Sequence, residues 1–421
     1  MPSELGLVAL HPKHDSTWRR GVTRVPFPKL TRLSSIGDTG AVTGESLVDL
    51  EVFRGALAEW LDDREALLQH QRDVFSLELA DVVAVQQEFQ AELFASGWAR
   101  HGWPEELGGL GGDARHRAML YDELGRRRVH AQHRPQRLRH EVRLGDRHAP
   151  HLAQRHLRDL LRGAERWCQG FSEPDAGSDL ASLRTKAVRD GDDWVVDGHK
   201  IWTSQATVAH RCVVLLRTGT PESRHRGLSM LLVDHDTPGV EVSGIRTMSG
   251  RDDLGELHFD GARVAGDRLI GGEGDGWAQA MYLLQWERGM YPWQRQAGLL
   301  GALDSLLERE GTTLEPLALA DAYLAVLPMR CSARDTIRRL AAGEMPGPEV
   351  SVDKVLLARA ELMVYDLAAV ALDGEVEFGD DRDASEWRHQ YLFSRSAPIY
   401  GGSYEIQRQI LAERVLGLPR G

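Results

Sequence analysis

Apolar residues recur with helical spacing from about Val48 onward. Phe53, Leu57, Trp60 and Leu61 form one stripe of the kind that an amphipathic helix buries. The same spacing continues through residues 82–94 and 118–124. Residues 1–46 lack it and are rich in Pro, Gly, Ser and Thr, which predicts a poorly ordered tail. We therefore expect a tail at 1–46 and an N-terminal helical domain at 47–165.

Short strand-like segments replace the helical pattern between about 166 and 275. Segments 193–196 and 199–202 flank Asp197-Gly198, which predicts a tight hairpin. Apolar runs at 212–216 and 228–233, with shorter ones at 240–242 and 256–259, predict further strands. These strands do not alternate with helices, so a parallel βαβ architecture is not expected. Residues 166–275 are assigned to a middle β domain.

Helical spacing returns at Gly276 and persists to the last helix. Ile406, Ile410, Leu411 and Val415 share one face there, and Gly417 followed by Pro419 predicts its end. Residues 276–421 are therefore expected to form a C-terminal helical domain. The order of helices, strands and helices predicts a multi-domain α+β protein.

The net charge and the hydropathy of the chain argue against some classes of binding partner. The 421 residues carry a formal net charge of −12, which argues against a nucleic-acid or anionic-membrane partner. No apolar run approaches the roughly 18 residues that a membrane span needs. The first 20 residues lack a basic segment followed by an apolar core, so no secretory signal is expected. These features favour a cytoplasmic location and no membrane span.

Common cofactor and metal motifs are not found. Cys168, Cys212 and Cys331 are far apart and show no CxxC or Cys/His spacing, so neither a disulfide framework nor a metal site is expected. The glycines of 271–276 have the wrong spacing for a dinucleotide-binding loop. A redox cofactor would therefore need a binding site of another kind.

Two long motifs lie far apart in the chain. The first comprises FSEPDAGSDL at 171–180 and DGHKIWTS at 197–204, and the second comprises IYGGSYEIQR at 399–408 with LGLPR at 416–420. Both resemble signatures of the acyl-CoA dehydrogenase family, in the same order. The resemblance is strong over 150–421 and weak over 48–125. Residues 347–351 and Lys354 resemble an actinobacterial-type branch of the family.

The resemblance implies a fold and a cofactor. An N-terminal α-helical domain, a central β-barrel-like domain and a C-terminal four-helix bundle would hold FAD between them, with a neighbouring subunit completing the FAD site. The implied reaction is α,β-desaturation of an acyl-CoA, with electrons passing to an electron-transferring flavoprotein. A homodimer or homotetramer is the expected assembly.

Individual roles follow from the same resemblance. Trp202 offers a flat wall for a flavin, and small hydroxyls can tune the flavin without adding bulk. The residues implied to contact FAD are Phe171, Ser172, Trp202, Ser204 and Ser403. Those implied to face the acyl-CoA are Ser178, Arg288, Tyr400 and Gly401. Alternatively, Trp202 is an ordinary core residue, and Ser172 and Ser178 cap turns.

The catalytic base is expected on a helix. Many family members carry a glutamate directly after the tyrosine of the C-terminal loop, but here that position is Gly401. Isovaleryl- and long-chain-type members instead carry the glutamate just before a helical arginine, as in Glu287-Arg288. We therefore assign Glu287 as the base, the alternative being an ion pair with an arginine on a solvated helix face. Glu405 is expected to pair with Arg408 or Arg414 at the surface.

Three departures leave alternatives open. The family's Arg-x-x-Phe stretch is not visible in 306–319, and its Gln-x-x-Gly-Gly stretch is replaced at 370–378, so the adenine half of FAD lacks its usual partners. Residues 126–148 hold eight Arg and four His without an apolar stripe. This segment fits a basic patch for coenzyme A phosphates, a solvated loop or, the interpretation we favour, a local frame error.

Two other functions remain open, and the missing FAD-binding stretches add weight to the first of them. One is a catalytically silent subunit that forms a hetero-oligomer with an active paralogue. The other is a flavin oxidase or monooxygenase on the same fold.

Overall fold

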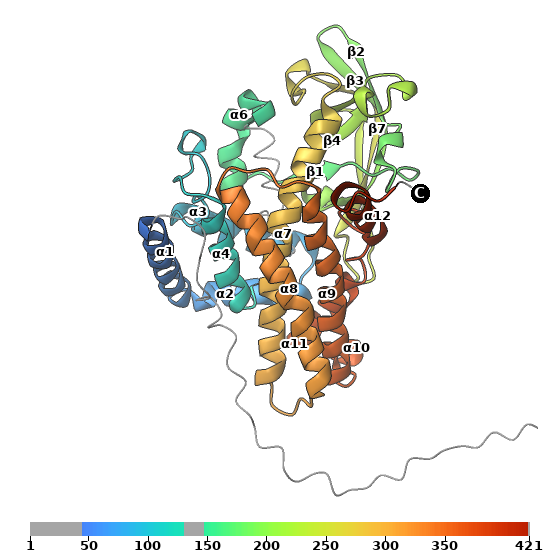
Figure 1. Ribbon diagram of the computed structural model, residues 1–421. Coiled ribbons are helices and arrows are strands. Elements are labelled where there is room, and N and C mark those ends of the chain that lie inside the picture. The colour runs from blue at the N-terminus through green and yellow to red at the C-terminus, as the bar shows by residue number, and fades with distance from the viewer. Residues whose placement is uncertain (1–43, 130–146, 420–421) are drawn as a thin grey trace, which may run out of the picture. The chain divides into compact units, whose positions relative to one another are not determined.

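The computed structural model describes residues 44–129 and 147–419 (Figure 1). Most of the predicted tail and residues 130–146 of the Arg- and His-rich segment lie outside the described residues. The described residues from Asp49 onward make their contacts as one unit. Among the described helices, none combines the length and apolar character that crossing a bilayer requires.

Helices form the N-terminal region, as the apolar stripe predicted. They are α1 (Gly44–Asp62), α2 (Glu65–Arg72), α3 (Leu79–Ala95), α4 (Ala114–Arg126) and α6 (Pro150–Leu161). Three residues of the stripe, Phe53, Leu57 and Leu61, are buried, and Trp60 packs at the edge of the same cluster. The predicted helical pattern is therefore confirmed in this region.

Arginines at the start of the Arg- and His-rich segment form ion pairs with residues of the surrounding helices. Arg127 forms ion pairs with Asp62 and Glu123 at 2.6 and 2.7 Å. Arg128 lies 2.9 Å from a carboxylate oxygen of Glu386 on α11. The start of the segment therefore links the N-terminal helices to the C-terminal ones.

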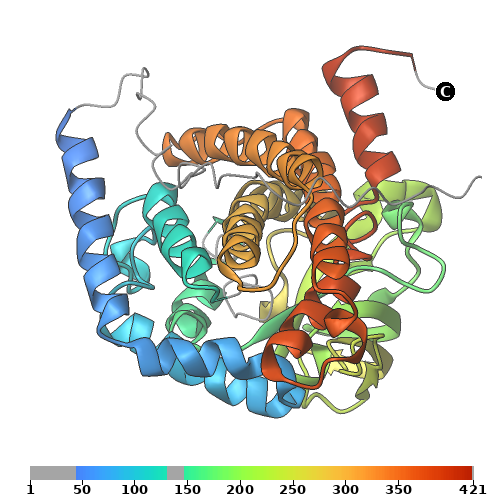
Figure 2. The same ribbon diagram turned by 90° about the horizontal axis from the view of Figure 1, so that it is seen from below.

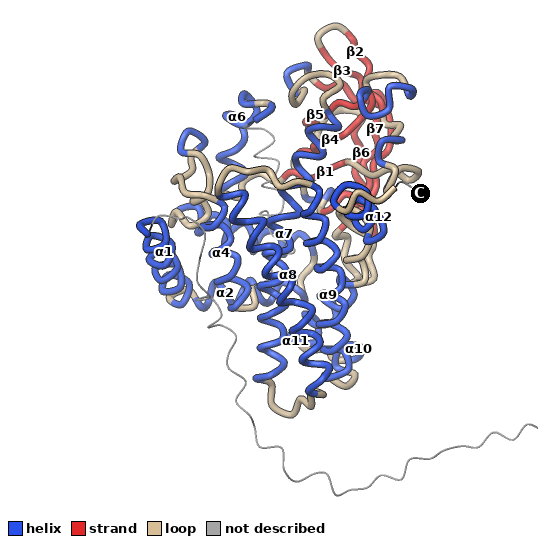
Figure 3. Tube along the Cα trace, in the orientation of Figure 1, coloured by secondary structure: helices blue, strands red, loops and turns tan. Residues whose placement is uncertain are grey.

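Seven described strands make one mixed sheet, drawn red in Figure 3. Its order is β1-β4-β2-β3-β7-β6, with β5 also paired to β4. The strands are β1 (Trp167–Gly170), β2 (Lys186–Asp190), β3 (Asp193–Ser204), β4 (Arg211–Arg217), β5 (Leu228–Asp234), β6 (Val240–Ile245) and β7 (Leu254–Val264). All the predicted strand segments lie within these strands.

Both faces of the sheet are buried at β4 and β5. Val213 and Leu215 pack with Leu283 of the long helix α7 (Gly276–Glu308), whereas Cys212 and Val214 belong to a cluster on the opposite face. Successive strand residues point to opposite faces. The continuous apolar runs at 212–216 and 228–233 follow from this two-sided burial.

The predicted hairpin at Asp197-Gly198 is wrong. Residues 193–204 form a single strand, β3, which pairs with β2 on one side and β7 on the other. The register with β7 shifts between Val196 and Gly198. A Cβ at Gly198 would lie 2.6 Å from Cα of Thr185, so the glycine allows a close backbone approach at an irregularity rather than a turn.

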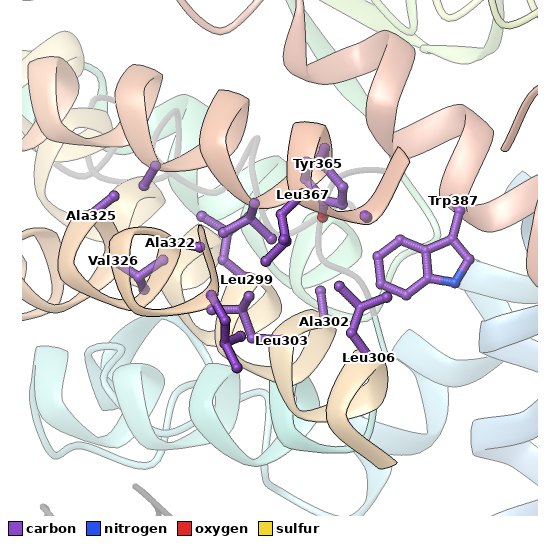
Figure 4. Packing of buried hydrophobic residues seen from close by; sticks show 14 of the residues in the cluster. Leu299, Ala302, Leu303, Leu306, Ala322, Ala325, Val326, Tyr365, Leu367 and Trp387 are labelled. Carbon is purple, nitrogen blue, oxygen red and sulfur yellow. The ribbon is translucent and has the colours of Figure 1, made fainter. Parts of the chain in front are cut away.

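The C-terminal region is helical, with α7 packed against α4 and two following helices (Figure 2). After α7 come α8 (Pro316–Ala341), α9 (Ser351–Ala371), α10 (Glu375–Phe378), α11 (Arg382–Ser394) and α12 (Tyr404–Ile410), which continues as a π-helical turn at Leu411–Val415. Leu299, Leu303 and Leu306 of α7 pack with side chains of α8, α9 and α11 (Figure 4). This arrangement agrees with the expected helical bundle.

The last helix has the predicted apolar residues but buries them incompletely. Ile406, Ile410 and Leu411 are half-buried, and Val415 is exposed. Gly417 has a φ of +67°, a left-handed conformation that glycine adopts without strain and that commonly ends a helix. The predicted end of the helix is confirmed.

Truncation of the bundle core should destabilise the protein strongly. Leu303 on α7 is fully buried, so Leu303→Ala should lower the free energy of unfolding by about 2–5 kcal/mol. Leu324→Ala is the control, because Leu324 on α8 is 64% exposed and its truncation should cost within about 0.5 kcal/mol. Urea denaturation followed by circular dichroism measures both, and equal losses would contradict this description of the core.

Candidate functional site

The end of β1 and the end of β3 lie side by side. The backbone N–H of Ile201 donates to the carbonyl oxygen of Ser172 at 2.9 Å. Phe171 is buried, whereas Ser172 and Ser204 are half-buried. Two adjoining segments therefore carry four of the residues expected at the flavin: Phe171, Ser172, Trp202 and Ser204.

Trp202 is turned out of the protein core. The register between β3 and β7 shifts between Lys200 and Thr203, and Trp202 has a left-handed φ of +60°. Its side chain is 57% exposed. A left-handed tryptophan costs free energy and is maintained only when its surroundings impose it. Trp202 is thus not a core residue, and its exposed ring is a surface on which a planar ligand can stack.

A buried ion pair lies beneath this surface. The Lys200 ammonium is fully buried and donates to Glu173 Oε1 at 2.7 Å and to the Phe171 carbonyl oxygen at 3.1 Å. Glu173 also accepts from the backbone N–H groups of Arg184 and Thr185, at 2.6 and 2.9 Å. These bonds hold the loop after β1 against β3.

Burial and the interaction between the two charges shift the pKa values of Lys200 and Glu173. Burial lowers the pKa of Lys200 to about 8, although Glu173 opposes the shift. Burial alone would raise the pKa of Glu173, but attraction to Lys200 and three hydrogen bonds lower it overall. Glu173 and Lys200 lie in the two parts of the first motif, 27 residues apart, and no local pattern indicates that they pair.

Glu287 lies where α7 meets β1. Its side chain is half-buried, and Oε1 accepts a hydrogen bond from Nε2 of Gln169 at 2.7 Å. Gln169 is two residues before Phe171, so the contact joins Glu287 to the strand that leads into the flavin-facing loop. Gln169 carried no signal in the sequence, because 118 residues separate it from Glu287.

The neighbouring Arg288 lies close to the C-terminal loop. A Cβ at Gly402 would lie 3.9 Å from its Nη2 and would overlap Nε2 of Gln407. Among the described residues, Nε of Arg288 and both polar atoms of the buried Gln407 amide have no hydrogen-bond partner. Burial lowers the pKa of Arg288, and Arg414 adds to the shift, while Glu287 opposes it. Buried polar groups are normally satisfied, so this region fits a polar ligand.

Tyr400 is held by the helical bundle. Its hydroxyl lies 3.1 Å from that of Tyr291 on α7, and the Lys354 ammonium lies 4.2 Å from the centre of its ring. Burial raises the pKa of Tyr400 well above its usual value. The next residue, Gly401, is exposed and has a φ of +64°. A glutamate there would need a conformation that glycine adopts far more readily.

Other predicted positions have simpler surroundings. Ser403 caps α12 by accepting the backbone N–H of Ile406 at 3.3 Å. Ser178 is exposed, and neither Ser178 nor Ser172 caps a described helix. Glu405 is exposed, but within 44–129 and 147–419 no ion pair joins it to Arg408 or Arg414, so that prediction is wrong.

Comparison with known proteins gives consistent matches. The acyl-CoA dehydrogenase middle-domain model matches residues 168–262, and the C-terminal-domain model matches residues 274–416. The acyl-CoA dehydrogenase IpdE1 of Mycobacterium tuberculosis is 40% identical over 347 residues, covering 80% of this chain and 88% of the relative. IpdE1 of Mycolicibacterium smegmatis is 35% identical over 89% of this chain and 99% of the relative.

A solved structure is also similar. The ChsE4-ChsE5 complex from Mycobacterium tuberculosis matches with a TM-score of 0.69 and 26% identity, covering 85% of this chain and 98% of the matched chain.

The buried ion pair should contribute strongly to stability. Lys200→Met leaves the Glu173 carboxylate buried without its counter-ion, which should cost about 3–5 kcal/mol of unfolding free energy. Lys186→Met is the control, because the Lys186–Asp197 pair on neighbouring strands is exposed and should contribute under about 1 kcal/mol. Denaturant unfolding measures both, and adding Glu173→Gln to Lys200→Met should recover part of the loss. A Lys200→Met protein as stable as the control would refute the role of the pair.

Proposed function

Because the chain belongs to the acyl-CoA dehydrogenase family of FAD-dependent oxidoreductases, we propose that it desaturates an acyl-CoA thioester between its α and β carbons, with Glu287 as the base. The observation that carries the proposal is the position of Glu287, half-buried and hydrogen-bonded to Gln169 at the junction of α7 with β1. The junction adjoins the loop whose residues are expected to line the flavin.

The residues at the end of β1 and β3 suit the family's cofactor. The exposed Trp202 ring would support the isoalloxazine, and Phe171, Ser172 and Ser204 would line it. When bound, FAD accepts the hydride that leaves the substrate β-carbon. The buried Lys200–Glu173 pair would keep this wall in place, because it fixes the loop carrying Phe171 and Ser172.

Glu287 would remove the proton from the substrate α-carbon. The hydrogen bond from Gln169 restrains the carboxylate, and correct placement of a base accounts for much of its catalytic effect. Arg288, the next residue on α7, places a positive charge beside the carboxylate, and Glu287 opposes the lowering of the Arg288 pKa by burial. Gly401 on the C-terminal loop has no carboxylate, and Glu405 on α12 is exposed. Glu287 is thus the acid best placed to act as the base.

The C-terminal loop would contact the acyl-CoA. Arg288 and Gln407 both lie near Gly402, and no described residue hydrogen-bonds to Nε of Arg288 or to the amide of Gln407. The thioester and the amides of the pantetheine arm offer acceptors and donors for such groups. We assign Ser178, Tyr400 and Gly401 to the same substrate surface, as the family resemblance implies.

We further propose that the working assembly contains a second acyl-CoA dehydrogenase chain. The similar solved structure is a complex of two differently named chains, ChsE4 and ChsE5. Near the C-terminus this chain also exposes Ile399, Leu416 and Leu418, at 69, 70 and 53%. Leu416 and Leu418 are two residues apart, and exposed apolar side chains that lie close together are typical of a protein interface. An electron-transferring flavoprotein would reoxidise the reduced enzyme.

Replacement of the base should abolish reduction of the flavin. In an anaerobic titration with acyl-CoAs of several lengths, the wild-type protein should lose its flavin absorbance near ~450 nm. Glu287→Gln should retain the flavin but bleach at least about 100-fold more slowly, because a general base contributes roughly that much. Glu405→Gln, which removes an exposed carboxylate near the same loop, should bleach like the wild type. Wild-type bleaching by Glu287→Gln would exclude Glu287 as the base.

The composition of the assembly can be tested by co-purification. The chain is expressed alone and together with a paralogous acyl-CoA dehydrogenase, and mass and flavin content are measured by light scattering and absorbance. A yellow complex of both chains is expected. A yellow, active oligomer of this chain alone would contradict the second chain, and rapid peroxide formation in air would favour the oxidase alternative.

A further inference from the structure

Two cysteines and a histidine that are distant in sequence converge on one face of the sheet. Cys168 on β1 is the register partner of Cys212 on β4, so both thiols lie on the same face. Cys212 is also the register partner of Val233 on β5. His235 lies two residues after Val233, so its side chain points to the same face as the two thiols. The three ligand atoms, Sγ, Sγ and an imidazole nitrogen, lie within 4.8 Å of one another.

The spacing suits a tetrahedral metal site. Zinc binds cysteine sulfur at about 2.3 Å and histidine nitrogen at about 2.0–2.1 Å, which places sulfur and nitrogen ligands about 3.6 Å apart. Sγ of Cys168 and Nε2 of His235 are 3.5 Å apart. Both thiols are fully buried and His235 is half-buried, so the group has one side nearer to solvent. We propose that Cys168, Cys212 and His235 bind a soft divalent metal ion such as Zn²⁺.

The surroundings of the three residues leave room for an ion. A Cβ at Gly170 would lie 2.9 Å from Cys212 Sγ, so the glycine leaves space beside the sulfur. Two thiolates neutralise a divalent ion, and Lys200 already has Glu173 as its counter-ion. Binding would release the thiol protons to solvent.

The ion would fasten β1 to β4 and to the end of β5. β1 leads directly into Phe171 and Ser172, so the site would act as a structural support beneath the proposed flavin wall. It takes no part in the proposed desaturation and does not depend on it. A second group, formed by His199, Glu256 and His258, is less enclosed: the His258 side chain is 47% exposed. That group serves as the control.

Metal retention tests the site in the purified full-length holoprotein. Reduced protein is incubated with excess Zn²⁺, passed through gel filtration and assayed for zinc and protein. We expect about one zinc per chain in the wild type, in Cys331→Ser and in His258→Gln. Cys168→Ser and His235→Gln should retain less than about a tenth of it. Zn²⁺ should also raise the melting temperature of the wild type but not that of His235→Gln.

Four results would overturn the proposal. They are a wild type that retains no zinc, wild-type retention by both Cys168→Ser and His235→Gln, loss of zinc from His258→Gln, and a Cys168–Cys212 disulfide found by mass spectrometry in the purified protein. Circular dichroism identifies a variant that has not folded. His235→Gln keeps the test decisive in that case, because it alters a half-buried residue just beyond β5 rather than a core thiol.

Discussion

The parallel pairing of β1 with β4 is the constraint on which the site depends. β1 has only four residues, and alternate side chains point to opposite faces of the sheet. Trp167 packs in the cluster that includes α7, and Gln169 reaches Glu287 on that helix, whereas Cys168 enters the cluster on the other face. A one-residue slip of this register would exchange the faces and separate Glu287 from its partner.

The buried Lys200–Glu173 pair extends that constraint to the loop after β1. Burying two charges is costly unless they are paired and hydrogen-bonded, and here the ammonium has two acceptors while the carboxylate binds two backbone N–H groups. The local backbone of Trp202 is strained, with the indole turned outward, directly after strand residues fixed by this pair. The protein thus maintains an exposed aromatic surface by anchoring the residues beneath it.

The position of the proposed base depends on α7 and on the loop that carries Gly401. Gly401 occupies the loop position where many relatives carry glutamate, and its left-handed backbone disfavours any other residue. Glu287 approaches instead from α7, whose first half packs against the sheet and whose second half packs into the bundle. The same helix therefore connects the substrate-facing groups to the main hydrophobic core.

The order of helices and strands and the family could be predicted from the amino-acid sequence, which also supplied the proposed site residues. Local apolar spacing and two long motifs carry that information, because each depends on residues close together in the chain. Only the folded chain shows which distant residues lie together: Gln169 with Glu287, Arg288 and Gln407 near Gly402, and Cys168 and Cys212 with His235. It also decided that Asp197-Gly198 is an irregularity within β3, because strands on both sides supply hydrogen bonds that a local turn signal cannot anticipate. Strand register and helix packing are long-range effects, and no spacing within one segment encodes them.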